Sequence, residues 1–172
     1  DAKNYHYSGN VHYHLGRFNE AKSKFQKALK LEPNDPKYLL FNIFLLFQLS
    51  EYDEMDTLSA KYNQLYPNTE DSRFLKAILH IKNGDKKEAL ALDLHPDNKM
   101  LIYLHLKMVE ESLDLLEKKS EQFLEKEISN YLVLKNHPIY DFLQSNHRFQ
   151  ELLKKHKYIY DKILRKYGDI EV

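Results

Sequence analysis

The stretch YHYSGNVHYHLGRFNEAKSKFQKALKLEP, residues 5–33, decides the fold. Small residues at Gly9 and Ala28 allow two antiparallel helices to approach closely, and aromatic side chains between them fill the remaining space. Gly16 permits the turn that separates the two helical runs, and Pro33 ends the second run. The stretch therefore predicts a helix–turn–helix unit.

Proline, glycine and other residues of the same kind recur at a spacing of 34 residues, which is typical of a repeat protein. One period separates Pro33 from Pro67, Phe18 from Tyr52 and Glu20 from Glu54. Two periods separate Gly9 from Ala77, Gly16 from Gly84 and Ala21 from Ala89. The chain is therefore expected to stack several similar helix pairs.

The first unit resembles the tetratricopeptide repeat (TPR) at Tyr5, Gly9, Phe18, Ala21, Phe25, Ala28 and Pro33. Weaker copies of the signature follow at Tyr52 and Pro67, and then at Ala77, Gly84 and Ala89. The resemblance implies an all-α protein, a right-handed superhelix of antiparallel helix pairs (a TPR-like α-solenoid) with an atypical C-terminal helical cap.

The spacing divides the chain into repeats at about 2–34, 36–69, 70–96 and 97–126, followed by a capping segment and long helix over 127–172. The third repeat is shortened, because Pro96 comes only seven residues after Ala89. Asn146 is the predicted N-cap of the final helix. Since the sequence starts at Asp1 without a methionine, we expect a fragment of a larger protein.

The capping segment carries a second resemblance. His137-Pro138, Tyr140-Asp141, Leu143, Ser145 and Arg148-Phe149 are similar to the closing segment of TPR domains in bacterial signalling proteins. In that family such repeats are joined to cyclase, kinase or DNA-binding domains. The resemblance implies a regulatory or scaffolding role in a bacterial signalling or transcription protein.

Composition excludes several classes of function. Twenty-six basic and 26 acidic residues give a formal net charge of zero, so nucleic acid is an unlikely partner. The chain has no cysteine, and its longest apolar run, Tyr38 to Phe47, is too short to span a membrane. We expect a cytoplasmic protein.

No motif for catalysis, cofactor binding or metal binding is found. The four glycines fit no phosphate-binding loop, and the nine histidines include no H-E-x-x-H pair. Carboxylate pairs such as Glu110–Asp114 lie on the polar face of a helix. The sequence therefore predicts a protein that is not an enzyme, with no cofactor, no metal and no catalytic residue.

The TPR resemblance implies a partner-binding groove lined by the first helix of each repeat. By alignment, its residues are His6, Asn10 and Tyr13, then Leu40, Phe44 and Phe47, and then Phe74, Ile78 and Ile81. Of the Lys, Asn and Arg clamp with which some members bind chaperone carboxylates, only Asn10 is matched. The expected ligand is a peptide or helix of another protein.

Two alternatives stay open from the sequence. The chain's own C-terminal segment, or a second copy in a homodimer, would fill the groove and make the protein a structural element. Separately, the basic helix from Asn146 to Lys166 would contact nucleic acid, a membrane, or the acidic stretch from Glu110 to Glu127.

Overall fold

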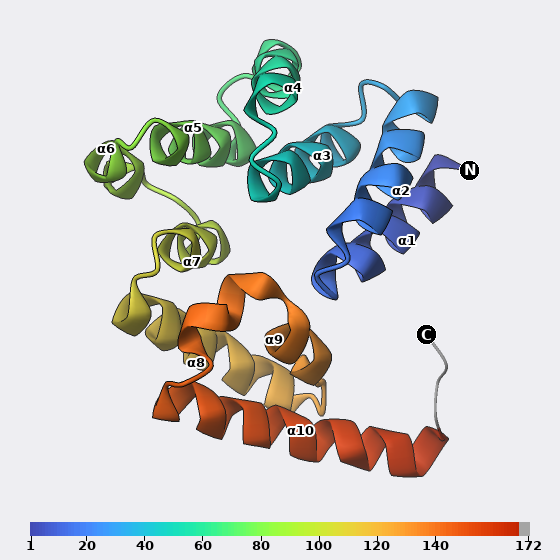
Figure 1. Cartoon of the computed structure of the whole chain (residues 1–172), viewed down its shortest axis with the longest axis vertical. Helices are drawn as coiled ribbons and strands as arrows, with labels where there is room; N and C mark the ends of the chain where they lie inside the picture. Colours follow the sequence, from blue (N-terminus) through green and yellow to red (C-terminus); the bar gives the residue numbers. More distant parts are fainter. Residues whose placement is uncertain (169–172) are drawn as a thin grey trace. The chain divides into compact units, whose positions relative to one another are not determined.

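A computed structural model describes residues 1–168, and within them the chain forms ten α-helices and one 3₁₀ helix, with no strand. Figure 1 shows the helices in chain order. The all-α class expected from the sequence is confirmed, with neighbouring helices in a TPR-like, repeated arrangement. The chain divides into an N-terminal unit, residues 1–98, and a C-terminal unit, residues 99–172.

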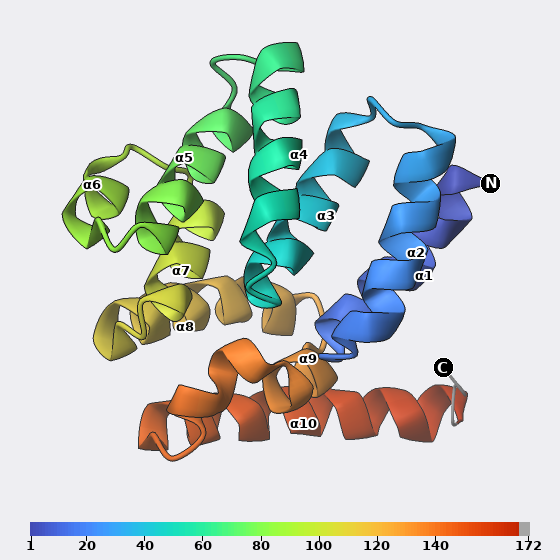
Figure 2. The same ribbon diagram turned by 45° about the horizontal axis from the view of Figure 1, so that its top comes forward.

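The N-terminal unit consists of helix pairs that follow the 34-residue period. The first pair is α1 (Ala2–His14) and α2 (Phe18–Leu31), and the second is α3 (Pro36–Gln48) and α4 (Tyr52–Leu65). The third pair is α5 (Glu70–Lys82) and α6 (Lys86–Ala91). In Figure 2 the helices of the first two pairs lie side by side in opposite directions. The second helix of the third pair, α6, has only six residues.

Helix starts and turns repeat with the same period. The side chains of Asp1, Asp35 and Thr69 accept backbone N–H hydrogen bonds at the starts of α1, α3 and α5. The turns inside the pairs have left-handed residues at Gly16, Ser50 and Gly84, with φ of 73°, 58° and 83°. Glycine adopts this conformation without strain, whereas for a serine it costs about 1 kcal/mol. Short-range chemistry therefore sets the ends of these helices.

The first helix pair is held by one fully buried ring. Phe25 on α2 has no exposed surface, and a Cβ atom built on Gly9 of α1 would lie only 2.5 Å from the ring. In the second pair, one period later, the equivalent residues are Ile43 and Ser59, both buried. The large side chain of the second pair therefore lies on its first helix, α3, and the small one on its second helix, α4. This exchange of volume explains how the second repeat departs from the signature and still packs.

Gly9→Ala is expected to lower the free energy of unfolding of the N-terminal unit by about 1–2 kcal/mol. Overpacking against a ring that has no free space costs about 1–3 kcal/mol, and the better helix propensity of alanine offsets up to about 1 kcal/mol of that cost. Urea unfolding followed by circular dichroism measures the change. A Phe25→Leu background provides room for the new methyl group, and the cost of Gly9→Ala should shrink there; an equal cost in both backgrounds would contradict the contact.

The C-terminal unit has its own core. Its helices are α7 (Pro96–His105, which begins just before the unit), α8 (Val109–Glu125), α9 (Tyr131–Asn136), the 3₁₀ helix η1 (Pro138–Leu143) and α10 (His147–Tyr167). The buried side chains are mostly leucine, with two aromatic rings: Met100, Leu104, Leu113, Leu116, Leu134, Tyr140, Leu143, Phe149, Leu152 and Leu153. Figures 1 and 2 both show α9 and η1 lying along α10. The predicted capping segment is thus built into this core.

The start of α10 follows the sequence prediction. The side chain of Asn146 accepts hydrogen bonds from the backbone N–H groups of Arg148 and Phe149, at 2.9 and 3.4 Å. Asn146 is therefore the N-cap, as expected. The predicted fourth repeat, 97–126, corresponds to α7 and α8 and falls almost wholly in the C-terminal unit. The predicted segment 127–172 ends in residues 169–172, which lie outside the described residues.

Candidate functional site

The predicted groove residues occupy equivalent positions on three helices of the N-terminal unit. His6, Asn10 and Tyr13 lie on α1, and adding 34 to each number gives Leu40, Phe44 and Phe47 on α3. Adding 34 again gives Phe74, Ile78 and Ile81 on α5. Within each helix the three residues are spaced i, i+4 and i+7, so they share one face. We call these nine positions the first-helix face.

Burial separates the nine residues into two groups. His6, Phe74 and Ile78 are buried, at 1%, 1% and 2% exposure, so they pack beneath the accessible residues and do not contact a partner directly. The other six are partly exposed and can touch a partner: Asn10, Tyr13, Leu40, Phe44, Phe47 and Ile81. The accessible part of the first-helix face is therefore polar on α1 and apolar on α3 and α5.

Aromatic rings connect the accessible and buried residues of α3 and α5. The ring of Phe44 meets the ring of Phe74 edge-on, with centroids 5.0 Å apart, and lies 6.2 Å from the ring of Phe41. Phe41 also packs 5.6 Å from Phe25, the buried ring of the first pair. Sequence alignment did not select Phe41, although it lies next to Leu40 and on the helix side that meets α2. Rings on rigid helices lose little entropy on binding, so this cluster is suited to anchor a partner.

The polar end of the face is built from two side chains of α1. The side-chain amide of Asn10 lies 3.3 Å from the Nε2 atom of His6. The His6 ring packs against Tyr38 and Phe41, with centroids 5.0 and 4.8 Å apart. Burial, and to a smaller extent the positive charge of Lys37, lowers the pKa of His6. His6 is therefore neutral at physiological pH and orients Asn10, which is itself partly exposed.

Asn42 is a structural residue that sequence reasoning missed. It is buried on α3, and its side-chain amide donates hydrogen bonds to the backbone carbonyl oxygens of Phe25 and Tyr38, at 3.1 and 2.8 Å. The first of these bonds connects α3 to α2, and the second lies within α3. The available signal was a single amide inside an otherwise apolar helix, since such a group needs partners when it is buried.

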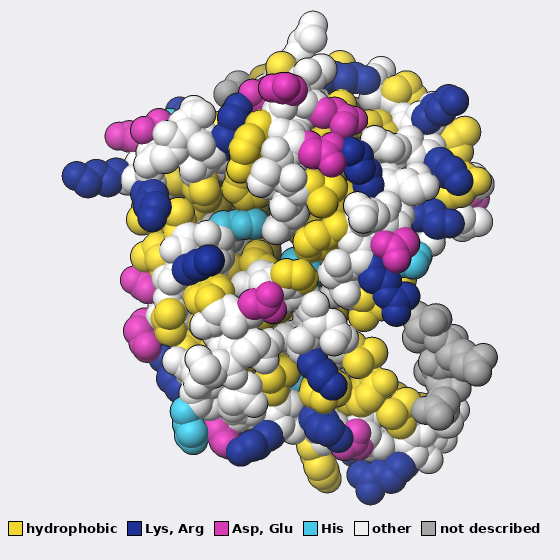
Figure 3. Space-filling model, viewed as in Figure 1, with side chains coloured by type: hydrophobic (Ala, Val, Ile, Leu, Met, Phe, Trp, Pro, Cys, Tyr) yellow, Lys and Arg dark blue, Asp and Glu magenta, His cyan; other side chains and the backbone are white. Residues whose placement is uncertain are grey.

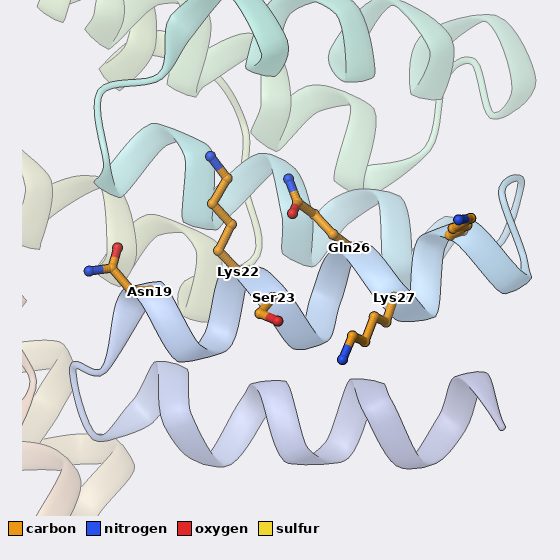
Figure 4. Close-up of a pocket in the computed structure, with 6 residues that line it drawn as sticks. Asn19, Lys22, Ser23, Gln26 and Lys27 are labelled. Atoms are coloured by element: carbon orange, nitrogen blue, oxygen red, sulfur yellow. The ribbon is translucent and has the colours of Figure 1, made fainter.

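A second surface of the first pair lies on α2 and is polar. Six polar residues of α2 line a shallow hollow that Figure 4 shows: Asn19, Lys22, Ser23, Gln26, Lys27 and Lys30. Two of its lysines already have partners, since Lys22 pairs with Glu51 and the ammonium group of Lys27 lies 5.5 Å from the ring of Tyr5. The hollow offers no enclosed volume and no apolar anchor.

The basic helix α10 meets the acidic stretch of α8, one of the alternatives left open by the sequence. The guanidinium group of Arg148 contacts Glu110, Asp114 and Glu117 at 2.7–2.8 Å, and Lys162 pairs with Glu127. The three carboxylates have i, i+4 and i+7 spacing, so they form one stripe of α8. Two basic residues of α10, Arg148 and Lys162, are therefore paired with carboxylates of residues 110–127.

Arg148→Lys is expected to lower the melting temperature of the C-terminal unit, even though it keeps the charge. A planar guanidinium donates to several carboxylates at once, whereas a lysine ammonium acts as a single point charge and leaves the three acidic groups repelling one another. Thermal unfolding at low and high salt measures the effect. The difference in melting temperature between the unchanged chain and Arg148→Lys should become smaller at high salt, because salt screens the repulsion among the carboxylates. The control is Lys154→Arg, which alters an exposed ion pair of the same helix.

The described residues show neither a metal-binding cluster nor a membrane-spanning helix. No group of three or more potential metal-binding side chains forms within residues 1–168. Every helix in this part of the chain is too short or too polar to cross a bilayer.

Comparison with known proteins identifies one segment. The family model of the tetratricopeptide repeat matches residues 2–35, which are α1, α2 and the turn that follows. No curated protein and no solved structure matches the chain. Tetratricopeptide repeats are generally protein–protein interaction modules and are typically non-enzymatic. The chain thus carries a tetratricopeptide repeat at residues 2–35, within an all-α, TPR-like arrangement of helix pairs.

Proposed function

We propose that this chain is a non-enzymatic interaction module that binds a peptide or helix of a partner protein on the first-helix face. The observation that carries the proposal is the repeated position of the accessible residues on α1, α3 and α5. Leu40, Phe44, Phe47 and Ile81 would supply apolar anchors, and Asn10 with Tyr13 would orient the ligand. An amphipathic helix bound by such anchors is a common mode of recognition.

The packing of the C-terminal segment supports an external partner over self-filling. Tyr140, Leu143, Phe149 and Leu152 are the apolar side chains that this segment would have to insert into a groove. They are buried against leucines of α8 and α9 within the C-terminal unit. The segment therefore uses its apolar surface for its own core. A second copy of the chain remains the competing occupant.

Site-directed photo-cross-linking tests the proposal. A benzophenone side chain at Leu40 or Ile81 should form adducts with a partner protein in cells that produce the chain. The control position is Ser23, which is exposed in the hollow on α2 (Figure 4). Equal adducts from Ser23 and Leu40, or none from Leu40, would overturn the assignment of the face. An adduct with the mass of two chains would identify a homodimer.

The resemblance of residues 136–149 to bacterial regulators supports a further part of the proposal. On this reading the chain is the regulatory or scaffolding part of a larger bacterial signalling or transcription protein. The intact mass and tryptic peptide map of the native polypeptide test it. A polypeptide much larger than 20.6 kDa with cyclase, kinase or DNA-binding peptides is expected; one near that mass would contradict it.

A further inference from the structure

The outward face of α10 carries several exposed basic side chains. Lys154, Lys155, Lys162 and Arg165 all lie within about 60° of Tyr158 around the helix axis, at about 100° per residue. We call these five residues the basic stripe. Glu151 and Asp161 lie within the same range of angles, so this face carries four cations and two carboxylates. The opposite face of α10 holds Phe149, Leu152, Leu153 and His156, which are buried. Figure 3 shows basic side chains along the lower edge of the view, where α10 runs in Figure 1.

The basic stripe keeps charge available for a ligand. Neither Lys155 nor Arg165 has a carboxylate partner among residues 1–168. Lys154 pairs with Glu151 and Lys162 pairs with Glu127, but these pairs are largely exposed. Exposed ion pairs are weak and exchange with competing charges. Four cations are thus able to face an acidic surface.

The exposed aromatic ring of Tyr158 lies among the basic residues of the stripe. Tyr158 is 65% exposed and has no role in the core. Tyrosine combines a large apolar area with a hydroxyl group and recurs among the residues that dominate binding at protein interfaces. A ring surrounded by cations fits a partner that brings one apolar side chain between carboxylates.

The same helix already binds carboxylates at its N-terminal end. Arg148 contacts three carboxylates of α8, spaced i, i+4 and i+7 along that helix. Residues of the basic stripe have a similar helical spacing, since Lys155, Tyr158 and Lys162 recur at i, i+3 and i+7. A helix with acidic residues at this spacing matches the basic stripe in both charge and geometry.

We infer that the basic stripe is a second docking surface, one that binds an acidic α-helix of a partner protein. Carboxylates of that helix would pair with Lys155, Lys162 and Arg165, and an apolar residue between them would cover Tyr158. A lipid surface fits less well, because the stripe offers no aliphatic side chain for insertion. Nucleic acid also fits less well, because Glu151 and Asp161 lie on the same face and the whole chain is formally neutral.

Fluorescence anisotropy with synthetic probes tests the inference on the whole chain. The main probe is a labelled helical peptide with glutamates at i, i+4 and i+7 around a leucine, and its matched control has glutamine in place of glutamate. The acidic peptide should bind, and its affinity should fall as salt rises. Lys155→Glu combined with Arg165→Glu should weaken binding about tenfold or more, and Tyr158→Ala should weaken it as well.

Matched variants distinguish binding at the basic stripe from a general effect of net charge. Lys86→Glu with Lys87→Glu makes the same change in net charge on exposed residues of α6 and should leave binding unchanged. Leu40→Ala, on the first-helix face, should also leave binding of the acidic peptide unchanged. A negative result for the basic stripe would therefore not count against the proposed function of the first-helix face. Tighter binding of labelled oligothymidylate or of phosphatidylserine vesicles than of the acidic peptide would overturn the inference. Equal binding of the acidic and glutamine peptides would overturn it too.

Discussion

Phe25→Ala is expected to lower the free energy of unfolding of the N-terminal unit by about 3–5 kcal/mol, the usual cost of removing a fully buried ring. Phe25 has no exposed surface and lies within 6.4 Å of the rings of His6, Tyr13 and Phe41, measured between centroids. Its removal leaves a cavity shared by α1, α2 and α3. Hydrogen exchange of amides in α1 and α2 reports on this unit alone and measures the loss.

The neighbouring residue Gln26 provides the control. It is exposed on α2, so Gln26→Ala should change the free energy by no more than about 0.5 kcal/mol. A loss below about 1 kcal/mol for Phe25→Ala would mean that the ring is not the centre of the first helix pair. Because the first-helix face depends on this packing, Phe25→Ala should also reduce cross-linking from Leu40.

Acidification from pH 7 to pH 5 is expected to destabilise the C-terminal unit through His105 and His156, whose pKa values are lowered in the folded protein. Burial lowers the pKa of His105 to about 4 and also lowers the pKa of His156. In the unfolded chain a histidine has a pKa near 6.5, so between these values the unfolded state binds more protons. The stabilisation is complete above about pH 6.5 and is lost as the pH falls towards 4. His105 alone should cost about 1–2 kcal/mol at pH 5.

The structure shows what opposes the protonation of His156. Its Nδ1 atom accepts a hydrogen bond from the backbone N–H of Asn130 at 3.2 Å, and its backbone carbonyl accepts one from the hydroxyl of Ser129. A proton on Nδ1 would face the Asn130 N–H and break the first bond. The loop before α9 should therefore detach from α10 in acid.

Hydrogen exchange of α8 and α10 amides at pH 7 and pH 5, corrected for the intrinsic rate, measures the pH effect. His105→Gln should reduce the pH dependence, because glutamine does not titrate in this range. His147→Gln changes an exposed histidine on α10 and should leave the pH dependence as it is. An unchanged pH dependence in His105→Gln would contradict the assignment.

The sequence by itself determined the helices and their repeat. Turns act over a few residues, so the 34-residue spacing of Pro33 and Pro67, and the doubled spacing of Gly16 and Gly84, predicted successive helix pairs. The capping side chains of Asp1, Asp35 and Thr69 follow the same spacing in the structure. The small and large residues of the first repeat likewise predicted its close helix contact. Asn146 predicted the start of α10 for the same local reason.

Only the tertiary structure decided which residues of the first-helix face are accessible. The repeat pattern treats Phe44 and Ile78 as equivalent, but Ile78 is buried and Phe44 is partly exposed, because burial depends on what packs over each helix. Tertiary structure also brought Arg148 to three carboxylates that lie 31–38 residues away in sequence. Local chemistry ends helices within one turn, whereas burial and ion pairing depend on contacts between distant segments, which a single sequence does not specify.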